Sequence, residues 1–569
     1  MGHDVVKADP LDLEILETYK ELNPSAAFLL GFNQYAGKLF IPSSENIQGG
    51  LRRIRELRKR AQTELQEKIL DALEAALLFD EPQPILDDIV GTIFSHLAKE
   101  GVNEGHLLSL LSYSSKAIDA TRARFEGREV PTGVKALCLY RLSGIIEILD
   151  AVKATDKVGE ELKGECDGLK AKATEFVKLF ELDGFGEGTF EEVESVFRRY
   201  VFELGRKDFY GVALVKGLDY VETPEELERK AISWIDEELP RFRGVVGKLA
   251  KRYGCPAETE EVEKGMNGRL DLKPSELLKV TRTIRNVVQR FADLDIVRIN
   301  PKYKTKLIET PSYLTGVIPT GAAQFFDTFT RRPFQLFFQT TDPKRDPDKS
   351  VSTLLNLLVH EEYGHCVHHS NSALGFMGEL NPLYLIPGLL SVPITEGLSF
   401  NREREFLEAV RRLETTKKKR LANAESDYGE LMKKYGGLEL MNLEVEFAVR
   451  KWRLVRFLRV VGDVRLNTGK QGLLEFLDWA HEYTGVQRSN IYFQLFPAHE
   501  GIFPGYATAY AVVGQEIMSI EKKIKDEKKR VRFSTYLCSI GYPPRSAYRK
   551  MLSSYAKKLR RKPTRRSSI

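Results

Sequence analysis

The residues best suited to chemistry lie in one short stretch, residues 354–370, which reads LLNLLVHEEYGHCVHHS. It holds four of the chain's nine histidines: His360, His365, His368 and His369. Two imidazoles on one helix face can bind a zinc ion, and a carboxylate next to the first of them, here Glu361, can accept a proton from water. The stretch therefore predicts a metal-binding helix of the kind that zinc hydrolases use.

The spacing of the first two histidines is unusual. His360 and His365 are five residues apart, one more than the spacing that brings two side chains to one helix face. On a regular helix they would point about 140° apart. We expect the extra residue to be absorbed as a π-bulge, and Gly364 is the residue that best tolerates such a distortion. Two pairs with ordinary four-residue spacing remain as alternatives: Glu361 with His365, and His365 with His369.

A catalytic zinc site needs a third protein ligand and one position left open for water. Glu396 is our candidate, because it lies near the expected start of a helix, 31 residues after His365. Its neighbours include Pro393, Gly397 and apolar residues in place of a run of charges. Glu403 follows seven residues later on the same helix face, where it could orient a ligand by hydrogen bonding.

The elements that must hold these residues are helices over most of the chain. Residues 51–79 and 224–253, for example, repeat apolar residues at three- and four-residue steps with charged residues between them. The residue composition changes at about residues 298–341. Within this region, residues 313–318 and 334–340 are rich in β-branched and aromatic residues and are bounded by prolines. We expect a mainly α fold with one small β-sheet beside the histidine helix.

Length and charge indicate the domain organisation. A chain of 569 residues is too long for one simple core. We expect a helical N-terminal lobe over residues 1–215, a catalytic lobe over 216–556 and a basic, disordered tail over 557–569. The tail carries seven Lys or Arg and no acid, and subtracting it from the formal charge of +5 leaves −2 for the rest. The body is therefore not expected to bind nucleic acid.

Cysteine use and apolar runs bear on location. The five cysteines are odd in number and lack close spacing, which favours a reducing compartment over a disulfide scaffold. The first residues contain no apolar signal-peptide core, and no uninterrupted apolar run reaches membrane-spanning length. We expect a cytoplasmic protein with no membrane partner, and leave its oligomeric state open.

Several motifs together resemble a family of zinc-peptidase-like proteins long catalogued only as a domain of unknown function. Its hallmarks are an H-E-x-x-P-G-H-H motif, similar to residues 360–369 here, and a later E-G-W segment with a second glutamate seven residues on, a spacing that Glu396 and Glu403 reproduce. Residues 22–35, 504–510 and 533–543 are similar to the family's opening, its P-G-Q-A-x-x-Y segment and its closing region.

The chain departs from that family at three points. The proline of the first motif is missing, so the two histidines are one residue closer, as in the H-E-x-x-G-H helix of dipeptidyl-peptidase III. The family's tryptophan is Leu398 here, and its glutamine is Tyr506. The resemblance implies a mainly helical, two-lobed peptidase of the gluzincin type, with a deep cleft between the lobes.

The resemblance implies one further role, and the residues themselves suggest others. Tyr510 matches the family's tyrosine and is our first choice for the donor that stabilises the oxyanion opposite the metal. Tyr506, which could also contact substrate, and His499 are close alternatives. His369 is expected to support the ligands from behind, and Cys366 to be an inert buried thiol.

These inferences predict a zinc-dependent peptidase, either a carboxypeptidase or an oligopeptidase. One Zn²⁺ per chain, held by His360, His365 and Glu396, would polarise the carbonyl of a peptide substrate, with Glu361 as general base. Two alternatives from other classes remain. One is a catalytically silent helical protein whose metal site is closed by a neighbouring histidine, and the other is a helical protein that binds partners. The sequence leaves open which end of a peptide would be cut.

Overall fold

The computed structural model describes residues 8–156, 158–185, 190–270, 272–315, 318, 320–330, 332–342, 350–415 and 423–561. Helices make up 72% of the chain and strands 3%, which confirms the predicted mainly α fold. Local sequence signals explain several helix starts. At the start of α11 (Pro224–Tyr253), for example, the Thr223 hydroxyl accepts from the Glu226 N–H, and the Glu226 side chain accepts from the Thr223 N–H in return. No helix among the described residues combines the length and apolar character needed to span a bilayer.

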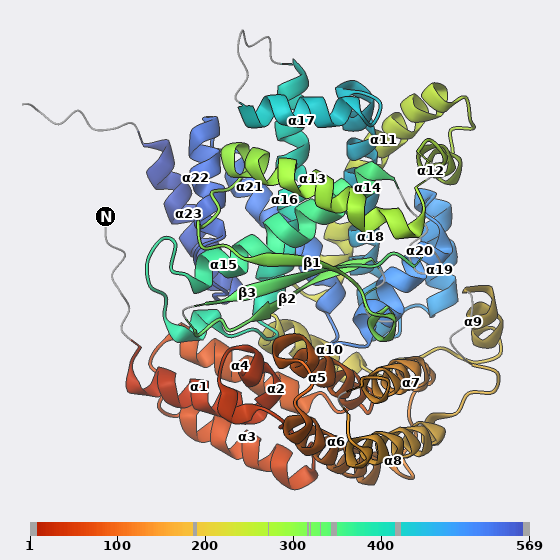
Figure 1. Cartoon of the computed structure of the whole chain (residues 1–569), viewed down its shortest axis with the longest axis vertical. Coiled ribbons are helices and arrows are strands. Elements are labelled where there is room, and N and C mark those ends of the chain that lie inside the picture. The colour runs from red at the N-terminus through yellow and green to blue at the C-terminus, as the bar shows by residue number, and fades with distance from the viewer. Residues whose placement is uncertain are drawn as a thin grey trace, which may run out of the picture.

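The N-terminal helices form the lower tier of Figure 1. They are α1 (Pro10–Leu22), α2 (Pro24–Leu29), η1 (Asn33–Tyr35), α3 (Ser44–Arg58), α4 (Glu64–Leu78), α5 (Pro84–Glu100), α6 (Glu104–Phe125), α7 (Thr132–Lys153) and α8 (Glu160–Val177) with η2 (Lys178–Phe180). The chain then passes to the upper tier through α9 (Phe190–Phe197), α10 (Lys207–Val212) and the π-helix η3 (Ala213–Gly217).

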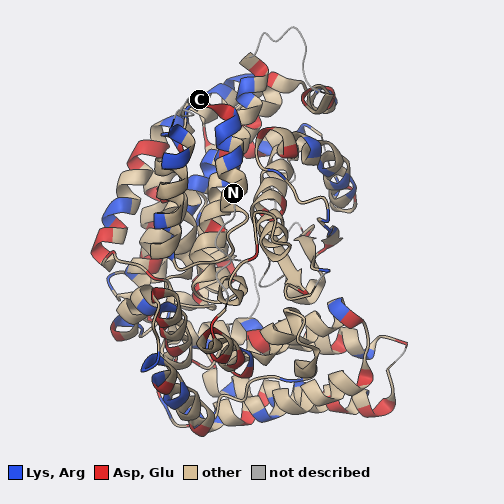
Figure 2. Ribbon diagram, turned by 90° about the vertical axis from the view of Figure 1, so that its left-hand side faces the viewer, with Lys and Arg blue, Asp and Glu red and all other residues tan. Residues whose placement is uncertain are grey.

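The upper tier holds the longer helices and the sheet. Its helices are α11 (Pro224–Tyr253), α12 (Thr259–Gly268), α13 (Pro274–Asp295), α14 (Val351–Leu358), η5 (Val359–Cys366), α15 (Val367–Ala373), η6 (Pro382–Leu385), α16 (Ser391–Thr415), α17 (Asn423–Lys433), α18 (Leu438–Asn467), α19 (Leu473–Thr484), α20 (Arg488–Leu495), η7 (Phe496–Glu500), η8 (Tyr506–Thr508), α21 (Ala509–Glu521), α22 (Glu527–Leu537) and α23 (Arg545–Arg560). In Figure 2 acidic and basic residues are interspersed along the helices.

The sheet has three strands in the order β1-β3-β2. β1 (Thr305–Glu309) pairs parallel with β3 (Phe334–Gln339), and β2 (Gly321–Phe326) pairs antiparallel with the other side of β3. β3 confirms one predicted strand. The prediction of a strand over 313–318 is wrong, because Ser312–Leu314 forms a 3-10 turn after Pro311, and residues 316 and 317 lie outside the described residues. The small sheet lies beside the histidine helix, as expected, with β2 at the edge.

The two tiers share one apolar core. The same cluster of buried side chains includes Leu137 of α7, Leu239 of α11 and Leu458 of α18, so the lobes are packed together and not merely linked. A second cluster lies within the upper tier and includes Leu355 and Tyr363 of the histidine helix, packed against apolar residues of neighbouring helices. Burial of apolar surface stabilises a fold by about 25 cal/mol per Å², so this shared core holds the two tiers together.

The tail predicted over residues 557–569 is helical at its start, over residues 557–560. Helix α23 continues to Arg560, where Leu552 and Ala556 on its apolar face are buried against the upper-tier core. Its last turn carries Lys557, Lys558 and Arg560, and cations there are favoured by the helix dipole. Residues 562–569 lie outside the described residues.

Candidate metal centre

The histidine stretch forms one continuous helix with a π-helical centre. Ser350 caps α14 by accepting from the Thr353 amide, and the helix then widens over Val359–Cys366 before resuming as α15. The Val367 N–H bonds the carbonyl of Glu362, five residues back, which defines a π-turn. Because residues five apart lie on one face of such a helix, His360 and His365 face each other, with ring centroids 4.9 Å apart. The predicted bulge is confirmed.

The reason for glycine at position 364 is space. A Cβ added to Gly364 would lie 2.1 Å from the Ser399 Oγ and 2.8 Å from the Ser399 Cα. The backbone of α16 therefore passes directly over the bulge, and only a residue without a side chain permits that approach. The sequence-based argument from conformational freedom named the right residue for an incomplete reason.

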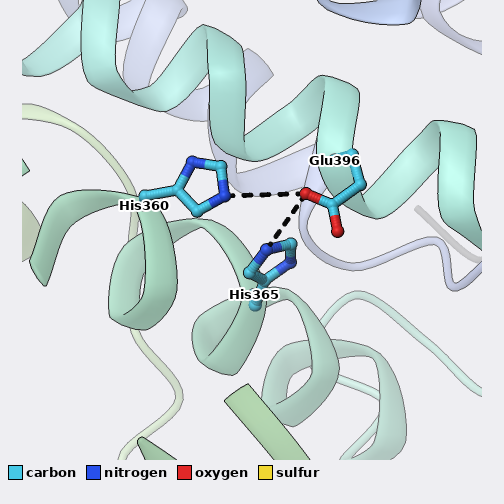
Figure 3. Close-up of side chains that lie close together, drawn as sticks. All are labelled: His360, His365 and Glu396. Carbon is cyan, nitrogen blue, oxygen red and sulfur yellow. Dashed lines mark ion pairs between the residues drawn. The ribbon is translucent and has the colours of Figure 1, made fainter. Parts of the chain in front are cut away.

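The third predicted ligand, Glu396, lies where α16 meets the histidine helix. Glu396 Oε2 is 3.6 Å from the Nε2 atom of His360 and 3.4 Å from the Nε2 atom of His365 (Figure 3). Four ligands at about 2.0–2.1 Å from a tetrahedral zinc ion stand about 3.3–3.4 Å apart, so these separations suit such a site. The three ligand atoms all lie within 4.8 Å of one another, and all three residues are buried. Within the described residues this is the one such group of histidines, cysteines or carboxylates.

The outward nitrogens of both imidazoles are held by hydrogen bonds. Glu403 Oε1 lies 2.7 Å from His360 Nδ1, as predicted, and Arg456 donates to the other Glu403 oxygen at 2.7 Å. Ser399 Oγ lies 3.2 Å from His365 Nδ1. These contacts leave both Nε2 atoms facing Glu396 and fix the ring orientations, which is the usual support of metal-ligating histidines.

The charges of the metal-free cluster favour a cation. Burial and the charge of Arg456 lower the pKa of His360, but its contacts with Glu396 and Glu403 outweigh both and raise it to about 9. Burial raises the pKa of Glu396, and the adjacent imidazoles outweigh this and hold it far below its usual range. The carboxylates thus stabilise a positive charge at the imidazoles. A bound metal ion would supply such a charge.

Glu361, the predicted general base, directly follows the candidate ligand His360 and lines the same cavity. Its side chain is buried, its Oε2 atom has no hydrogen-bond partner, and burial is the main cause that raises its pKa. The adjacent Glu362 differs completely, since it forms a bidentate pair with Arg285 at 2.6 and 2.7 Å and accepts from the Tyr303 hydroxyl. Glu362 is thus held in an ion pair, whereas Glu361 Oε2 has no partner among the described residues.

The three candidate oxyanion donors, Tyr510, Tyr506 and His499, lie in contact with one another. The ring of Tyr510 is 6.1 Å from that of His360, and its hydroxyl is 3.0 Å from His499 Nε2. Because His499 Nδ1 lies 2.7 Å from the Gln494 carbonyl, Nδ1 carries the proton and Nε2 accepts from Tyr510. The Tyr506 hydroxyl donates to Glu396 Oε1 at 3.3 Å.

Two neighbouring residues do not take part. The predicted supporting role of His369 is wrong: Thr328 and Gln335 occupy its two nitrogens at 2.7 and 2.9 Å, and its ring stacks on Phe325. It fastens the helix to the sheet, because regular α-helix resumes after the π-turn and turns it away from the ligands. Cys366 is buried, and burial raises the pKa of its thiol far above the usual value, so we expect it to be unreactive.

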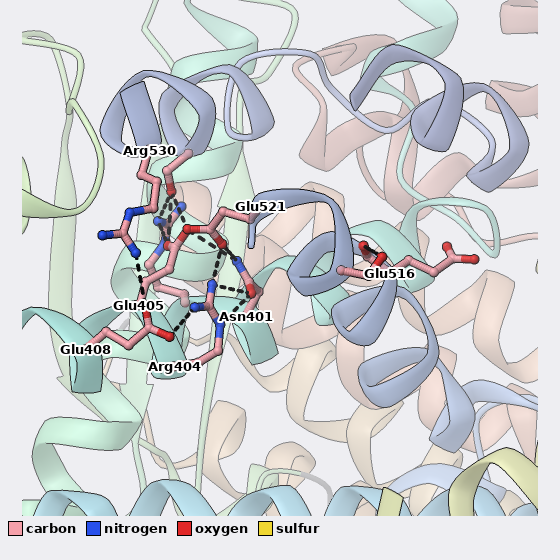
Figure 4. A network of polar contacts seen from close by, with 10 residues as sticks. Asn401, Arg404, Glu405, Glu408, Glu516, Glu521 and Arg530 are labelled. Carbon is pink, nitrogen blue, oxygen red and sulfur yellow. Dashed lines mark hydrogen bonds and ion pairs between the residues drawn. The ribbon is translucent and has the colours of Figure 1, made fainter. Parts of the chain in front are cut away.

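Helix α16 is anchored on its other side. Figure 4 shows Arg404 paired with Glu521 of α21, while Asn401 donates to the same carboxylate at 3.1 Å. Glu405 accepts from the Ser534 hydroxyl of α22 at 3.0 Å. These contacts, together with the close approach of Gly397 to Val513, hold α16 in place as the support for Glu396.

A cavity of about 670 Å³ opens onto the ligands. Its walls come from both tiers and from the edge of the sheet, which matches the cleft expected between the lobes. Residues from four distant parts of the chain line it: Tyr19, Asn23, Ile69 and Leu73 of the lower tier, Gly321, Ala323 and Phe325 of β2, Trp452, Arg456 and Arg459 of α18, and Tyr506, Tyr510 and Tyr542 near the C-terminus. Three segments that carry the family resemblance thus meet at this cavity.

Comparisons with known proteins address the fold. No protein-family model matches the chain, and no curated sequence matches it significantly. Among solved structures, the one titled "putative lipoprotein from Colwellia psychrerythraea" is similar with a TM-score of 0.67 and 13% identity, over 96% of this chain and 98% of that chain. Another, titled "a putative lipoprotein of unknown function from Shewanella oneidensis", gives a TM-score of 0.62 and 14% identity, over 95% and 98% of the two chains. At these identities the likeness shows a shared fold.

The same comparison contradicts the cytoplasmic location predicted from the sequence, because both similar structures are titled lipoproteins. That prediction depended largely on the scarcity of cysteine. A chain with two large apolar clusters needs no disulfides for stability, so few cysteines do not identify the compartment.

Proposed function

We propose that the protein is a zinc-dependent peptidase. The observation that carries the proposal is the convergence of His360, His365 and Glu396 at tetrahedral ligand spacing, with the unpartnered carboxylate of Glu361 beside them on a cavity wall. Three protein ligands and an adjacent carboxylate are the composition of a catalytic zinc site.

The alternative of a closed structural metal site has less support. It requires a fourth protein ligand, and the neighbouring histidines contact other groups. His368 Nε2 lies 2.9 Å from the Gly541 carbonyl and its ring contacts Tyr542, while both nitrogens of His369 are occupied. We therefore expect three protein ligands, with a fourth position on the cavity side for water.

Each residue has a definite part in the reaction. When bound, zinc supplies a Lewis acid that polarises the scissile carbonyl and makes water more acidic. Glu361 accepts the proton of the attacking water and passes it to the leaving amine, a role that its raised pKa suits. Tyr510 would turn its hydroxyl from His499 to the oxyanion, and His499, fixed by Gln494, would accept it again afterwards.

The edge of the sheet offers a place for a peptide backbone. The Thr340 N–H donates to the Thr320 carbonyl at 2.9 Å, which sets the alternation of the β2–β3 ladder. By that alternation Gly321, Ala323 and Phe325 direct their N–H and C=O groups away from β3, and all three line the cavity. An extended peptide added to this edge would pass beside the ligands.

The test compares zinc content and hydrolysis in two variants. Wild-type protein should contain one zinc per chain and cleave members of a mixed peptide library, with cleavage lost on chelation and restored by zinc. Glu361→Gln should retain the zinc and lose at least about a hundredfold in turnover, as removal of a general base does. His365→Ala should lose both. Full turnover in Glu361→Gln, or wild-type protein that takes up no zinc, would refute the proposal.

A further inference from the structure

Two cations line the cavity, Arg456 and Arg459, and they differ in their partners. Arg456 is committed to the Glu403 carboxylate at 2.7 Å. Arg459 donates to the Gln494 side-chain oxygen, a neutral acceptor, and no carboxylate in the described part of the chain pairs with it. Its guanidinium is therefore the cavity's one positive charge that no described carboxylate neutralises.

Arg459 is also deeply buried. Its side chain is 3% exposed, and its Nε atom has no hydrogen-bond partner. Burial is the main reason why its pKa falls to about 10, which still leaves it charged at neutral pH. A buried charge without a counter-ion is costly, so a site that retains one gains from any anion that enters.

The position of Arg459 relative to the ligands sets a length. Its Cζ atom lies 4.9 Å from the centre of the Tyr510 ring, which is 6.1 Å from the centre of the His360 ring. Added together, these distances limit the separation between the guanidinium carbon and the His360 ring to 11.0 Å. An extended residue spans about 3.3–3.6 Å, so the carboxylate of the first residue after a scissile bond at the metal centre falls within this limit.

We infer that Arg459 binds the terminal carboxylate of a peptide substrate, so that the protein removes single residues from the carboxyl end. The inference rests on the proposed function and names its substrate class. In the reaction water adds across the last C–N bond: its oxygen becomes part of the new terminal carboxylate, one of its protons goes to the amine, and a free amino acid leaves. Trp452 and Tyr510, both within 6.0 Å of the guanidinium, give the site an aromatic wall that suits an apolar last residue.

An acidic side chain beside the scissile bond could present the same carboxylate to Arg459. Three matched peptides distinguish the sources: one ending in phenylalanine, the same peptide as its C-terminal amide, and an amide that ends in glutamate. Wild-type protein should cleave the free acid at least about a hundredfold more efficiently, in kcat/KM, than either amide, given the strength of a buried charge pair. Equal cleavage of the free acid and its amide, or preferred cleavage of the glutamate amide, would overturn the assignment.

Variants separate binding from positioning. Arg459→Gln should reduce the ratio of kcat/KM for the free acid to that for the amide to about one, and Arg459→Lys should recover part of the preference. Arg465→Gln, on the same helix but away from the cavity, should keep the full preference, with zinc content checking the fold of each variant. If Arg459→Gln instead slows both peptides equally, the arginine only positions Tyr510 and the inference is wrong.

A binding measurement keeps this inference independent of catalysis. Titration calorimetry on metal-free protein should show acetyl-phenylalanine binding at least about tenfold more tightly than acetyl-phenylalanine amide, and the difference should vanish in Arg459→Gln. If that pattern holds while no peptide is cleaved, the proposed function fails and the carboxylate site stands. If peptides are cleaved but acid and amide bind alike, the carboxylate site fails and the peptidase stands.

Discussion

Replacement of Gly364 by alanine tests whether the packing of two helices sets the metal geometry. The new Cβ would lie 2.6 Å from the Ser399 Cβ and 2.8 Å from the Ser399 Cα, whereas ordinary van der Waals contact begins at 3.4 Å. The Ser399 Oγ, 2.1 Å away, can rotate, but the Cβ and Cα atoms cannot. Helix α16 must therefore recede by about 0.8 Å, the difference between 2.6 and 3.4 Å, or the π-turn must shift by as much.

That displacement acts directly on the ligands, because Glu396 lies on the receding helix and His365 is next to the substituted residue. Metal sites tolerate ligand shifts of about 0.2 Å, so we expect zinc affinity to fall about 10–100-fold. Overpacking costs about 1–3 kcal/mol, and the better helix propensity of alanine offsets up to about 1 kcal/mol. The net loss in free energy of unfolding should be at most about 2 kcal/mol.

Competition with a fluorescent chelator measures the zinc affinity, and urea denaturation of the metal-free protein measures the stability. Gly247→Ala is the matched control, since Gly247 is also inside a helix but its added Cβ would meet nothing within 4 Å. It should be neutral or slightly stabilising and leave zinc affinity unchanged. If Gly364→Ala behaves like this control in both assays, α16 does not set the ligand geometry and the argument fails.

Three further outcomes are expected. Glu403→Ala should lower stability by about 3–5 kcal/mol in urea denaturation, because Arg456 would keep a buried charge without its partner, and Glu403→Gln should recover part of the loss; equal stability of the alanine variant and wild type would contradict this. Burial raises the pKa of Glu222, but hydrogen bonds from Arg545 outweigh it and lower the pKa to about 2. The folded-state pKa thus lies below the ordinary 4.5, so the free energy of unfolding of wild type should exceed that of Glu222→Gln by its full amount above pH 4.5. This difference in stability should shrink as the pH falls towards 2, and a difference that stays constant would contradict the pairing. Mass spectrometry after alkylation of native protein should find Cys366 unmodified, and rapid labelling there would show that it is accessible.

The ligand set could be predicted because its chemistry is local. Few residue types bind zinc, and the irregular spacing of His360 and His365 had one simple structural solution, a π-turn. Glu396 and Glu403 were identifiable because a seven-residue step returns to the same helix face. Residue type and helical periodicity were sufficient for these four, and the geometry agrees with both.

Contacts from distant segments could not be predicted in the same way. Arg456 supports His360 through Glu403, but its helix contains many arginines, and only the tertiary fold selects the one that meets the site. His369 shows the opposite case. Its proximity in sequence suggested a role at the metal, whereas the return to α-helical geometry after the π-turn directs it to the sheet. The prediction of a strand over residues 313–318 was wrong because proline-bounded apolar runs suit tight turns as well as strands.

One face of α16 makes three separate contacts with the metal centre. Glu396 is one of the three proposed ligands, Ser399 approaches both Gly364 and His365, and Glu403 lies within hydrogen-bonding distance of His360. These positions follow the three- and four-residue steps of a single helical stripe, so they move as one rigid unit. The site therefore depends on how one helix packs against another and not on a flexible loop. It follows that substitutions in the α16–α21 contact, which never touch the metal, should alter its affinity along with those of the ligands themselves.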